Sequence, residues 1–159
     1  MPELPQTHRQ ALRTLVPRLS WESLTWALTG STSFALQGVP VEEPADIDVQ
    51  TTDSGAYAIE DLFPDAVVEP VSRSASDRIR SHFGELRIEG VSVEVMGDVQ
   101  KRRADGSWES PVDVESHREM IEWEGFEVPV LSLSYEAAAY EQLGRTERAD
   151  LLREAIGDQ

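Results

Sequence analysis

The chain has 159 residues, 40% of them hydrophobic, and contains no cysteine. This length and composition predict a single folded domain over residues 1–159 and exclude a disordered chain and a disulfide-stabilised scaffold. The chain has fourteen basic and thirty acidic residues. The resulting net charge of −16 opposes binding to nucleic acids and anionic membranes unless a local basic patch overrides it.

The acidic residues are scattered along the whole chain instead of being gathered in one tail, and Lys101 is the only lysine. This pattern favours adaptation to a salt-rich cytoplasm, a halophilic character, over an acidic surface directed at a partner. No secretory signal is recognisable at the N-terminus, and no run of about eighteen apolar residues occurs. We therefore expect a cytoplasmic protein without a membrane span.

Apolar spacing and turn residues predict the elements of the first half of the chain. They are, in order, a helix over residues 7–19 that breaks near Pro17, a strand over 23–30, a helix over 31–38 capped by its Ser/Thr cluster, a strand over 46–52, a helix over 54–63 and a strand over 66–71. Strands and helices thus alternate at the start of the chain.

Hairpins are predicted for the second half. The pattern indicates one hairpin over residues 85–98 turning near Gly90 and another over 118–131 turning near Gly125. Residues 72–87, which follow the last of the early strands, are expected to form an exposed loop and helix. Two helices over about 132–157, broken at Gly144, end the chain. This order predicts an α/β (α+β) fold with a mixed sheet and helices packed on at least one face.

Two aspartates stand one residue apart in the predicted strand over 46–52. Asp46 and Asp48 point to one face of a strand, while Ile47 and Val49 point to the other. Carboxylates at this spacing can share a hard divalent cation such as Mg²⁺. A solvated strand edge with alternating polarity would produce the same pattern, so the pair alone leaves both interpretations open.

A third acid, Glu94, lies between Val93 and Val95 in the interior of a predicted strand. It points away from the valine face, and a sheet that pairs the two strands would bring it beside Asp46 and Asp48. A solvent-facing glutamate is the alternative in so acidic a chain.

The segment Leu28-Thr29-Gly30-Ser31 joins a predicted strand to a helix. A glycine lets the backbone approach a phosphate closely, and the helix start offers unpaired N–H groups together with the hydroxyls of Ser31 and Ser33. An ordinary capped helix would look the same.

Taken together, these motifs resemble the DNA polymerase beta-like nucleotidyltransferase superfamily, in particular its small stand-alone members. Leu28-Thr29-Gly30-Ser31, Asp46-Ile47-Asp48-Val49 and Val93-Glu94-Val95 stand for its three motifs, and the resemblance covers about residues 24–97. It implies the palm-like fold of that superfamily with a single nucleotidyltransferase domain.

The resemblance also implies the chemistry. Asp46, Asp48 and Glu94 would be the catalytic residues and would hold Mg²⁺ or Mn²⁺, while Gly30, Ser31 and Ser33 would bind the phosphates of a nucleoside triphosphate. A nucleoside monophosphate would pass to an unidentified hydroxyl acceptor, which is a small molecule, a protein or RNA.

Basic residues are the candidate contacts to that acceptor. Arg73, Arg80 and His82 lie in the arginine-rich segment 72–87, where pairing with local acids is the alternative, and Lys101 opens a basic cluster that follows the third acid and otherwise forms a solvated turn. The C-terminal helices lack the lysine that many small relatives carry, and Arg145 or Arg148 could replace it.

Two functions remain open from the sequence. The chain is either an active nucleotidyltransferase or a catalytically weak binding module of the same fold, similar to the antitoxins of toxin–antitoxin pairs that act with a helical partner. The small size implies that a homodimer or a partner protein completes the cleft.

Overall fold

The structure is a computed structural model that describes residues 4–41 and 44–157. Its elements follow in the order α1 (Gln6–Trp21), β1 (Trp26–Thr29), α2 (Gly30–Leu36), β2 (Ile47–Thr51), α3 (Asp53–Leu62), the 3-10 helix η1 (Pro64–Ala66), β3 (Val67–Ala75), β4 (Ile79–Ile88), β5 (Val91–Lys101), α4 (Val114–His117), β6 (Arg118–Trp123), β7 (Phe126–Leu131), α5 (Leu133–Gln142) and α6 (Thr146–Gly157).

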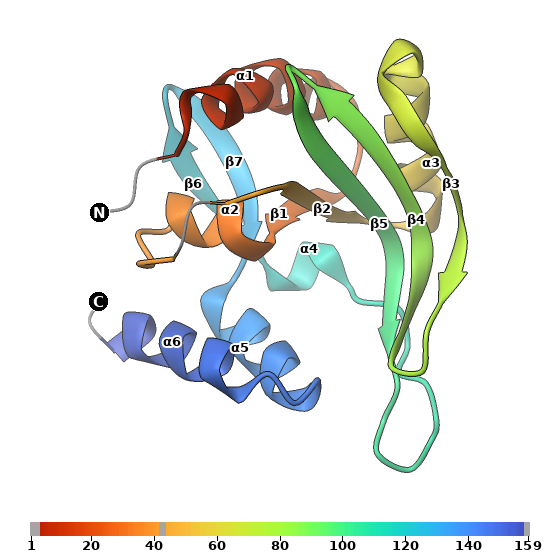
Figure 1. The fold of residues 1–159 in the computed structure, drawn as a ribbon, viewed down its shortest axis with the longest axis vertical. Helices are drawn as coiled ribbons and strands as arrows, with labels where there is room; N and C mark the ends of the chain where they lie inside the picture. Colours follow the sequence, from red (N-terminus) through yellow and green to blue (C-terminus); the bar gives the residue numbers. More distant parts are fainter. Residues whose placement is uncertain (1–3, 42–43, 158–159) are drawn as a thin grey trace.

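All seven strands form one mixed sheet in the order β3-β4-β5-β2-β1-β7-β6 (Figure 1). The hairpin partners run antiparallel, whereas β2 pairs with β5 and β1 pairs with β7 in parallel. The predicted mixed sheet with packed helices is therefore confirmed, and the two parallel contacts bring segments far apart in the chain to the centre of the sheet.

One face of the sheet is covered by α1 and α3 (Figure 1). Most strand residues that point to this face are apolar and buried, and they form the main core with the apolar side of α1. Every second residue of β2 and β5 is buried, and the apolar residues that point to this face from the two strands include Ile47, Val49, Val91, Val93 and Val95.

The opposite face carries α4 and α5. A smaller cluster of Ala27, Val114 and Leu131 packs there, with Tyr135 of α5 against it. A further cluster joins Phe34 of α2 to Leu152 of α6. The C-terminal helices are thus packed on α2, next to the end of β1, and leave the middle of this face to polar side chains.

The two hairpin turns lie where the sequence predicts them. Glu89 and Gly90 connect β4 to β5, and Glu124 and Gly125 connect β6 to β7. All four residues have positive φ, as a two-residue hairpin turn requires. The break between α5 and α6 also falls at Gly144, which has a φ of 80°.

Three expectations about local structure were wrong. Helix α1 does not break near Pro17 but continues to Trp21, after which the Glu22 N–H donates to the Leu19 carbonyl. Residues 72–87 form most of the hairpin of β3 and β4, because β4 pairs with β5 along its length and supplies a template for the exposed β3. The hydroxyls near the start of α2 do not cap it.

In the part of the chain that the structure describes, no helix combines the length and apolar character that crossing a membrane requires.

Candidate active site

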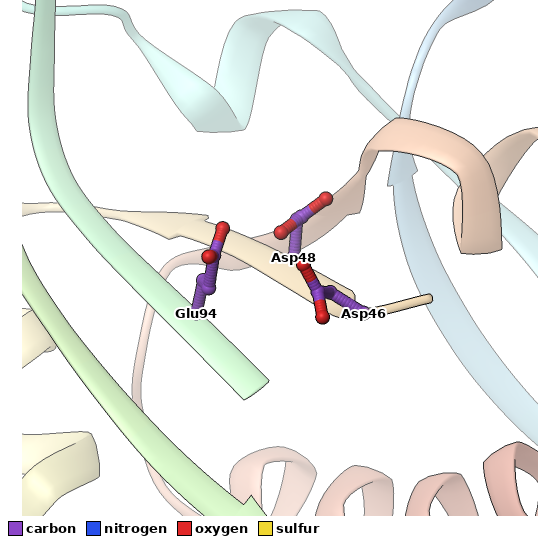
Figure 2. Close-up of side chains that lie close together, drawn as sticks. All are labelled: Asp46, Asp48 and Glu94. Carbon is purple, nitrogen blue, oxygen red and sulfur yellow. The ribbon is translucent and has the colours of Figure 1, made fainter. Parts of the chain in front are cut away.

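The polar face of the sheet carries a row of side chains across three adjacent strands. Thr29 of β1 lies opposite Asp48 of β2, and Asp48 lies beside Glu94 of β5. Residues paired in this way project to the same side of a sheet. The strand register therefore brings the Asp48 and Glu94 side chains together, as the sequence predicts (Figure 2).

Asp46 completes the group from the residue just before β2. The Thr32 hydroxyl of α2 donates to the Asp46 backbone carbonyl over 2.7 Å and fixes the chain there. Each of the three acids offers one carboxylate oxygen, and these oxygens all lie within 4.8 Å of one another. All three side chains are half-buried, so the cluster is both partly shielded and reachable.

This crowding changes the charge state of the acids in the metal-free protein. Burial, a hydrogen bond with Glu94 and the negative charges of Glu94 and Asp46 raise the pKa of Asp48 from 3.8 to about 8. Two neighbouring carboxylates cannot both ionise easily in a poorly hydrated site. The metal-free cluster therefore binds a proton more tightly than an isolated aspartate does.

Gly30 closes the row at the end of β1. Its φ is 73°, and a Cβ atom added there would lie 2.5 Å from Asp48 Oδ2. No side chain fits without moving the carboxylate, and the backbone conformation itself disfavours other residues. Glycine at this position keeps the space in front of Asp48 open.

The donor set of the site fits a hard divalent cation. Three carboxylates converge, and Asp48 Oδ1 is buried without a hydrogen-bond partner among the described residues. A buried carboxylate oxygen without a donor is costly, and a cation removes that cost. Mg²⁺ and Mn²⁺ both accept carboxylate oxygens, so the residues present suit either ion.

A hollow of about 960 Å³ lies next to the turn from β1 to α2, and none of the three acids of the cluster is among the described residues around it. Ser31 lines one wall, and Arg145 and Arg148 from the start of α6 line another. Both arginines stack on the ring of Tyr140. Ser33 is not part of this hollow, because it is fully buried and its hydroxyl accepts from the Gln37 side chain.

The arginine-rich segment forms a different hollow. Arg73, Arg80 and His82 line a space of about 220 Å³, and the three acids of the cluster are likewise not among the described residues around it. The Arg80 guanidinium stacks on Trp108 and donates to Gln100, and His82 contacts Tyr57 of α3. The structure thus brings these three predicted residues together, but next to α3.

Lys101 does not lie in a solvated turn, which was one of the two interpretations of its cluster. The residue is 5% exposed, and Nζ donates to the Tyr135 hydroxyl over 3.0 Å. The Glu109 carboxylate lies 3.7 Å from Nζ. The only lysine of the chain therefore ties the end of β5 to α5, at one wall of a hollow of about 330 Å³.

Sequence reasoning missed Glu136. This residue of α5 is 4% exposed, and its carboxylate accepts a hydrogen bond from the Thr29 hydroxyl in the row of the site. Burial is the main cause that raises the pKa of Glu136 to about 8. Its spacing to Leu133, Ala137 and Tyr140 places it on the apolar side of the helix, which is the signal that could have identified it.

Comparison with known proteins identifies the family of the chain. A model of the aminoglycoside-2''-adenylyltransferase family matches residues 11–155. The chain belongs to this family. No curated protein matches the sequence significantly.

Solved structures extend the comparison. A candidate nucleotidyltransferase from Thermotoga maritima is 47% identical, with a TM-score of 0.86 over 99% of this chain and 97% of its own. The lincosamide antibiotic adenylyltransferase LnuA, bound to lincomycin, has a TM-score of 0.63 at 12% identity, covering 97% of this chain and 99% of its own. The aminoglycoside enzyme ANT(2'')-Ia, with adenylyl-2''-tobramycin, has a TM-score of 0.59 at 11% identity, covering 95% and 91%.

These similarities confirm the nucleotidyltransferase fold and class that the sequence motifs predict. The two antibiotic-modifying enzymes share the fold at low identity, so their substrates are properties of those proteins. The family and the Thermotoga protein identify this chain as a nucleotidyltransferase.

Proposed function

We propose that this nucleotidyltransferase moves an adenylyl group from ATP to a hydroxyl of a small-molecule acceptor, with Asp46, Asp48 and Glu94 as the catalytic residues. The observation that carries the proposal is the strand register that places Asp48 beside Glu94, with Asp46 within 4.8 Å. An acid cluster that is half-buried on an otherwise packed sheet has a cost in stability, which a bound cation offsets.

The three carboxylates would hold Mg²⁺ or Mn²⁺. When bound, the ion lowers the pKa of the acceptor hydroxyl and neutralises charge on the phosphates. The protein's own contribution is the position of the carboxylates, which the sheet fixes through two strands and the Thr32 hydrogen bond.

The reaction exchanges one phosphorus–oxygen bond for another. The acceptor oxygen forms a bond to the α-phosphorus of ATP, the bond from that phosphorus to pyrophosphate breaks, and the hydroxyl proton passes to a carboxylate. We assign the proton to Glu94, whose β5 position lies at the side of the cluster away from the turn between β1 and α2.

The triphosphate would occupy the hollow beside the turn. Ser31 offers a hydroxyl on one wall, and Arg145 and Arg148 offer guanidinium groups on the other. Guanidinium groups bind phosphate oxygens in a bidentate manner, so these arginines can take the role of the lysine that the tail lacks. Gly30 would leave room for a phosphate beside Asp48.

The acceptor is assigned by class only. The family name and the two antibiotic-modifying fold neighbours support a sugar-like small molecule with a free hydroxyl. Arg73, Arg80, His82 and Lys101 stay predictions as acceptor contacts. Of these, Arg73 is exposed and Lys101 is the most deeply buried.

Calorimetric titration of the four nucleoside triphosphates with Mg²⁺ or Mn²⁺ tests the proposal. We expect ATP to bind only in the presence of the divalent ion, and Asp48→Asn to weaken this binding by about a hundredfold or more, because it removes a charge that holds the ion. Asp61→Asn is the matched control, since Asp61 is exposed on α3, which covers the other face of the sheet.

Wild-type protein that binds no triphosphate with either ion would contradict the proposal and favour the binding module that acts with a partner. Binding that survives Asp48→Asn unchanged would show that the site lies on other residues.

A further inference from the structure

Glu136 is the least expected side chain near the site, because it places a carboxylate inside a helix packing face. It is 4% exposed on α5, between Leu133 and Ala137, which are also buried. One oxygen accepts from the Thr29 hydroxyl, and the carboxylate also interacts with the Gly30 backbone N–H. The other oxygen, Oε2, is buried without a hydrogen-bond partner in the described part of the chain.

Burying this group costs free energy that an apolar residue would avoid. No described cation forms an ion pair with Glu136, and the charge of Arg148 acts on it only weakly. A leucine at position 136 would match its neighbours on the helix and fill the space. Stability of the packing therefore does not explain a glutamate here, whereas its contacts to Thr29 and Gly30 do.

Those contacts lie between the acid cluster and the hollow that Ser31 lines. Thr29 lies directly across from Asp48, and Gly30 begins α2, where Ser31 lines one wall of the hollow. Glu136 itself belongs to α5, which packs extensively on α6. Another wall of the same hollow comes from the start of α6, through Arg145, the residue before the helix, and Arg148 within it.

We propose that Glu136 is a positioning residue that sets the distance between the two walls of the triphosphate hollow, by tying α5 to the Thr29 hydroxyl and the Gly30 backbone. The inference rests on the proposed function for its role in catalysis. It adds a residue from the C-terminal helices that touches neither the ion nor the reacting atoms but aligns Ser31 with the arginines.

Four variants test this inference. Glu136→Ala and Thr29→Val each remove the contact, while Glu136→Gln and Thr29→Ser each keep a hydrogen bond between the two side chains. Thr29→Val retains the shape of the side chain, so it carries the test if Glu136→Ala fails to fold. Glu141→Gln is the matched control, because Glu141 lies on the exposed side of the same helix and pairs with Arg153.

The first readout compares two ligands. We expect Glu136→Ala and Thr29→Val each to weaken ATP binding in Mn²⁺ by about tenfold, the effect of losing one hydrogen bond to a charged or buried group, with binding of Mn²⁺ alone changed less than about twofold. Glu136→Gln and Thr29→Ser should stay within about threefold of wild type. The combined Glu136→Ala and Thr29→Val protein should bind ATP no more weakly than either single variant.

The second readout does not depend on nucleotide. We expect the amide hydrogens of Gly30 and Ser31 to exchange faster in Glu136→Ala and Thr29→Val than in wild type or Glu141→Gln, because the turn loses its anchor. If the wild type binds no ATP, the proposed function fails while this measurement still decides the positioning role.

Three binding results would overturn the inference. They are unchanged ATP affinity in both Glu136→Ala and Thr29→Val, a loss of Mn²⁺ affinity as large as the loss of ATP affinity, or a Glu136→Gln variant as impaired as Glu136→Ala. Unchanged amide exchange at the turn would also count against it.

Discussion

The two faces of the central sheet differ in character, although alternate residues of the same strands form them. One face is apolar and packed, and the other carries crowded carboxylates. On the side of α1 and α3, Ile47 and Val93 are fully buried among apolar neighbours. On the other side, Asp48 and Glu94 crowd two carboxylates together, and Asp48 Oδ1 lacks a partner among the described residues. One face therefore stabilises the fold, and the other face carries a cluster of acids that lowers stability, as expected if it is the proposed site.

The largest expected contrast is between two adjacent residues of β2. Ile47→Ala should lower the free energy of unfolding by about 2–5 kcal/mol, because it leaves a cavity in the main core. Asp48→Asn should leave the metal-free protein as stable as wild type or more stable, since it relieves repulsion in the cluster. Urea denaturation without divalent ions measures both. A large loss of stability in Asp48→Asn would mean that this carboxylate is part of the scaffold.

Gly30 lies at the edge of the polar face, where a substitution tests the close contact with Asp48. Gly30→Ala should cost about 1–2 kcal/mol from the left-handed backbone alone, with an additional cost from contact with Asp48 Oδ2. Gly90→Ala is the matched control, because Gly90 has a similar φ of 79° and open space around its Cβ position. Equal destabilisation of the two variants in urea would argue against the close contact at Asp48.

The free energy of unfolding should depend on pH through the buried acids Asp48 and Glu136. The pKa of Asp48 and that of Glu136 are both raised to about 8, from 3.8 and 4.5. The folded protein binds these protons more tightly than the unfolded chain, so their contribution to stability is complete below about pH 4 and is lost as pH rises to about 8.

Metal-free urea melts at pH 5 to 9 would measure this decline. Asp48→Asn and Glu136→Gln should each flatten it, and Asp61→Asn should not. A stability that rises between pH 5 and pH 8 in the wild type would contradict the raised pKa values.

The smallest expected effect concerns the surface outside both faces. If the net charge of −16 reflects adaptation to salt, dilution from molar KCl to about 0.1 M should lower the melting temperature, because repulsion between carboxylates is less screened. A melting temperature that is unchanged or rises on dilution would favour a surface directed at a partner.

The sequence predicted what depends on local alternation. Apolar residues at every second position assign Ile47 and Val93 to the core and leave Asp48 and Glu94 on the other face, and the turns at Gly90 and Gly125 follow from turn chemistry. The direction in which the acids point therefore follows from the sequence alone, and the pairing of β2 with β5 follows when these acids are taken as one site.

Other features depend on contacts that are distant in sequence. The predicted strand over 66–71 covers the first part of β3, but residues 72–75 are exposed and carry no large apolar side chain, so only their pairing with β4 extends the strand to Ala75. The contact of Glu136 with Thr29 spans 107 residues, and helix periodicity alone does not show what a buried glutamate meets. The surroundings of Arg80 and Lys101 likewise depend on distant partners, which are Trp108 for Arg80 and Tyr135 for Lys101.

The register of β2 on β5 has a consequence for how the chain avoids misfolding. Ile47 pairs with Val93 and Asp48 with Glu94 over a parallel contact that no tight turn fixes. A slip of one residue in either strand would send its acids into the apolar layer under α1 and α3 and its valines out to the opposite side. The carboxylates proposed as catalytic would thereby disfavour any register shifted by one residue, so the same residues would also help to specify the pairing of β2 with β5.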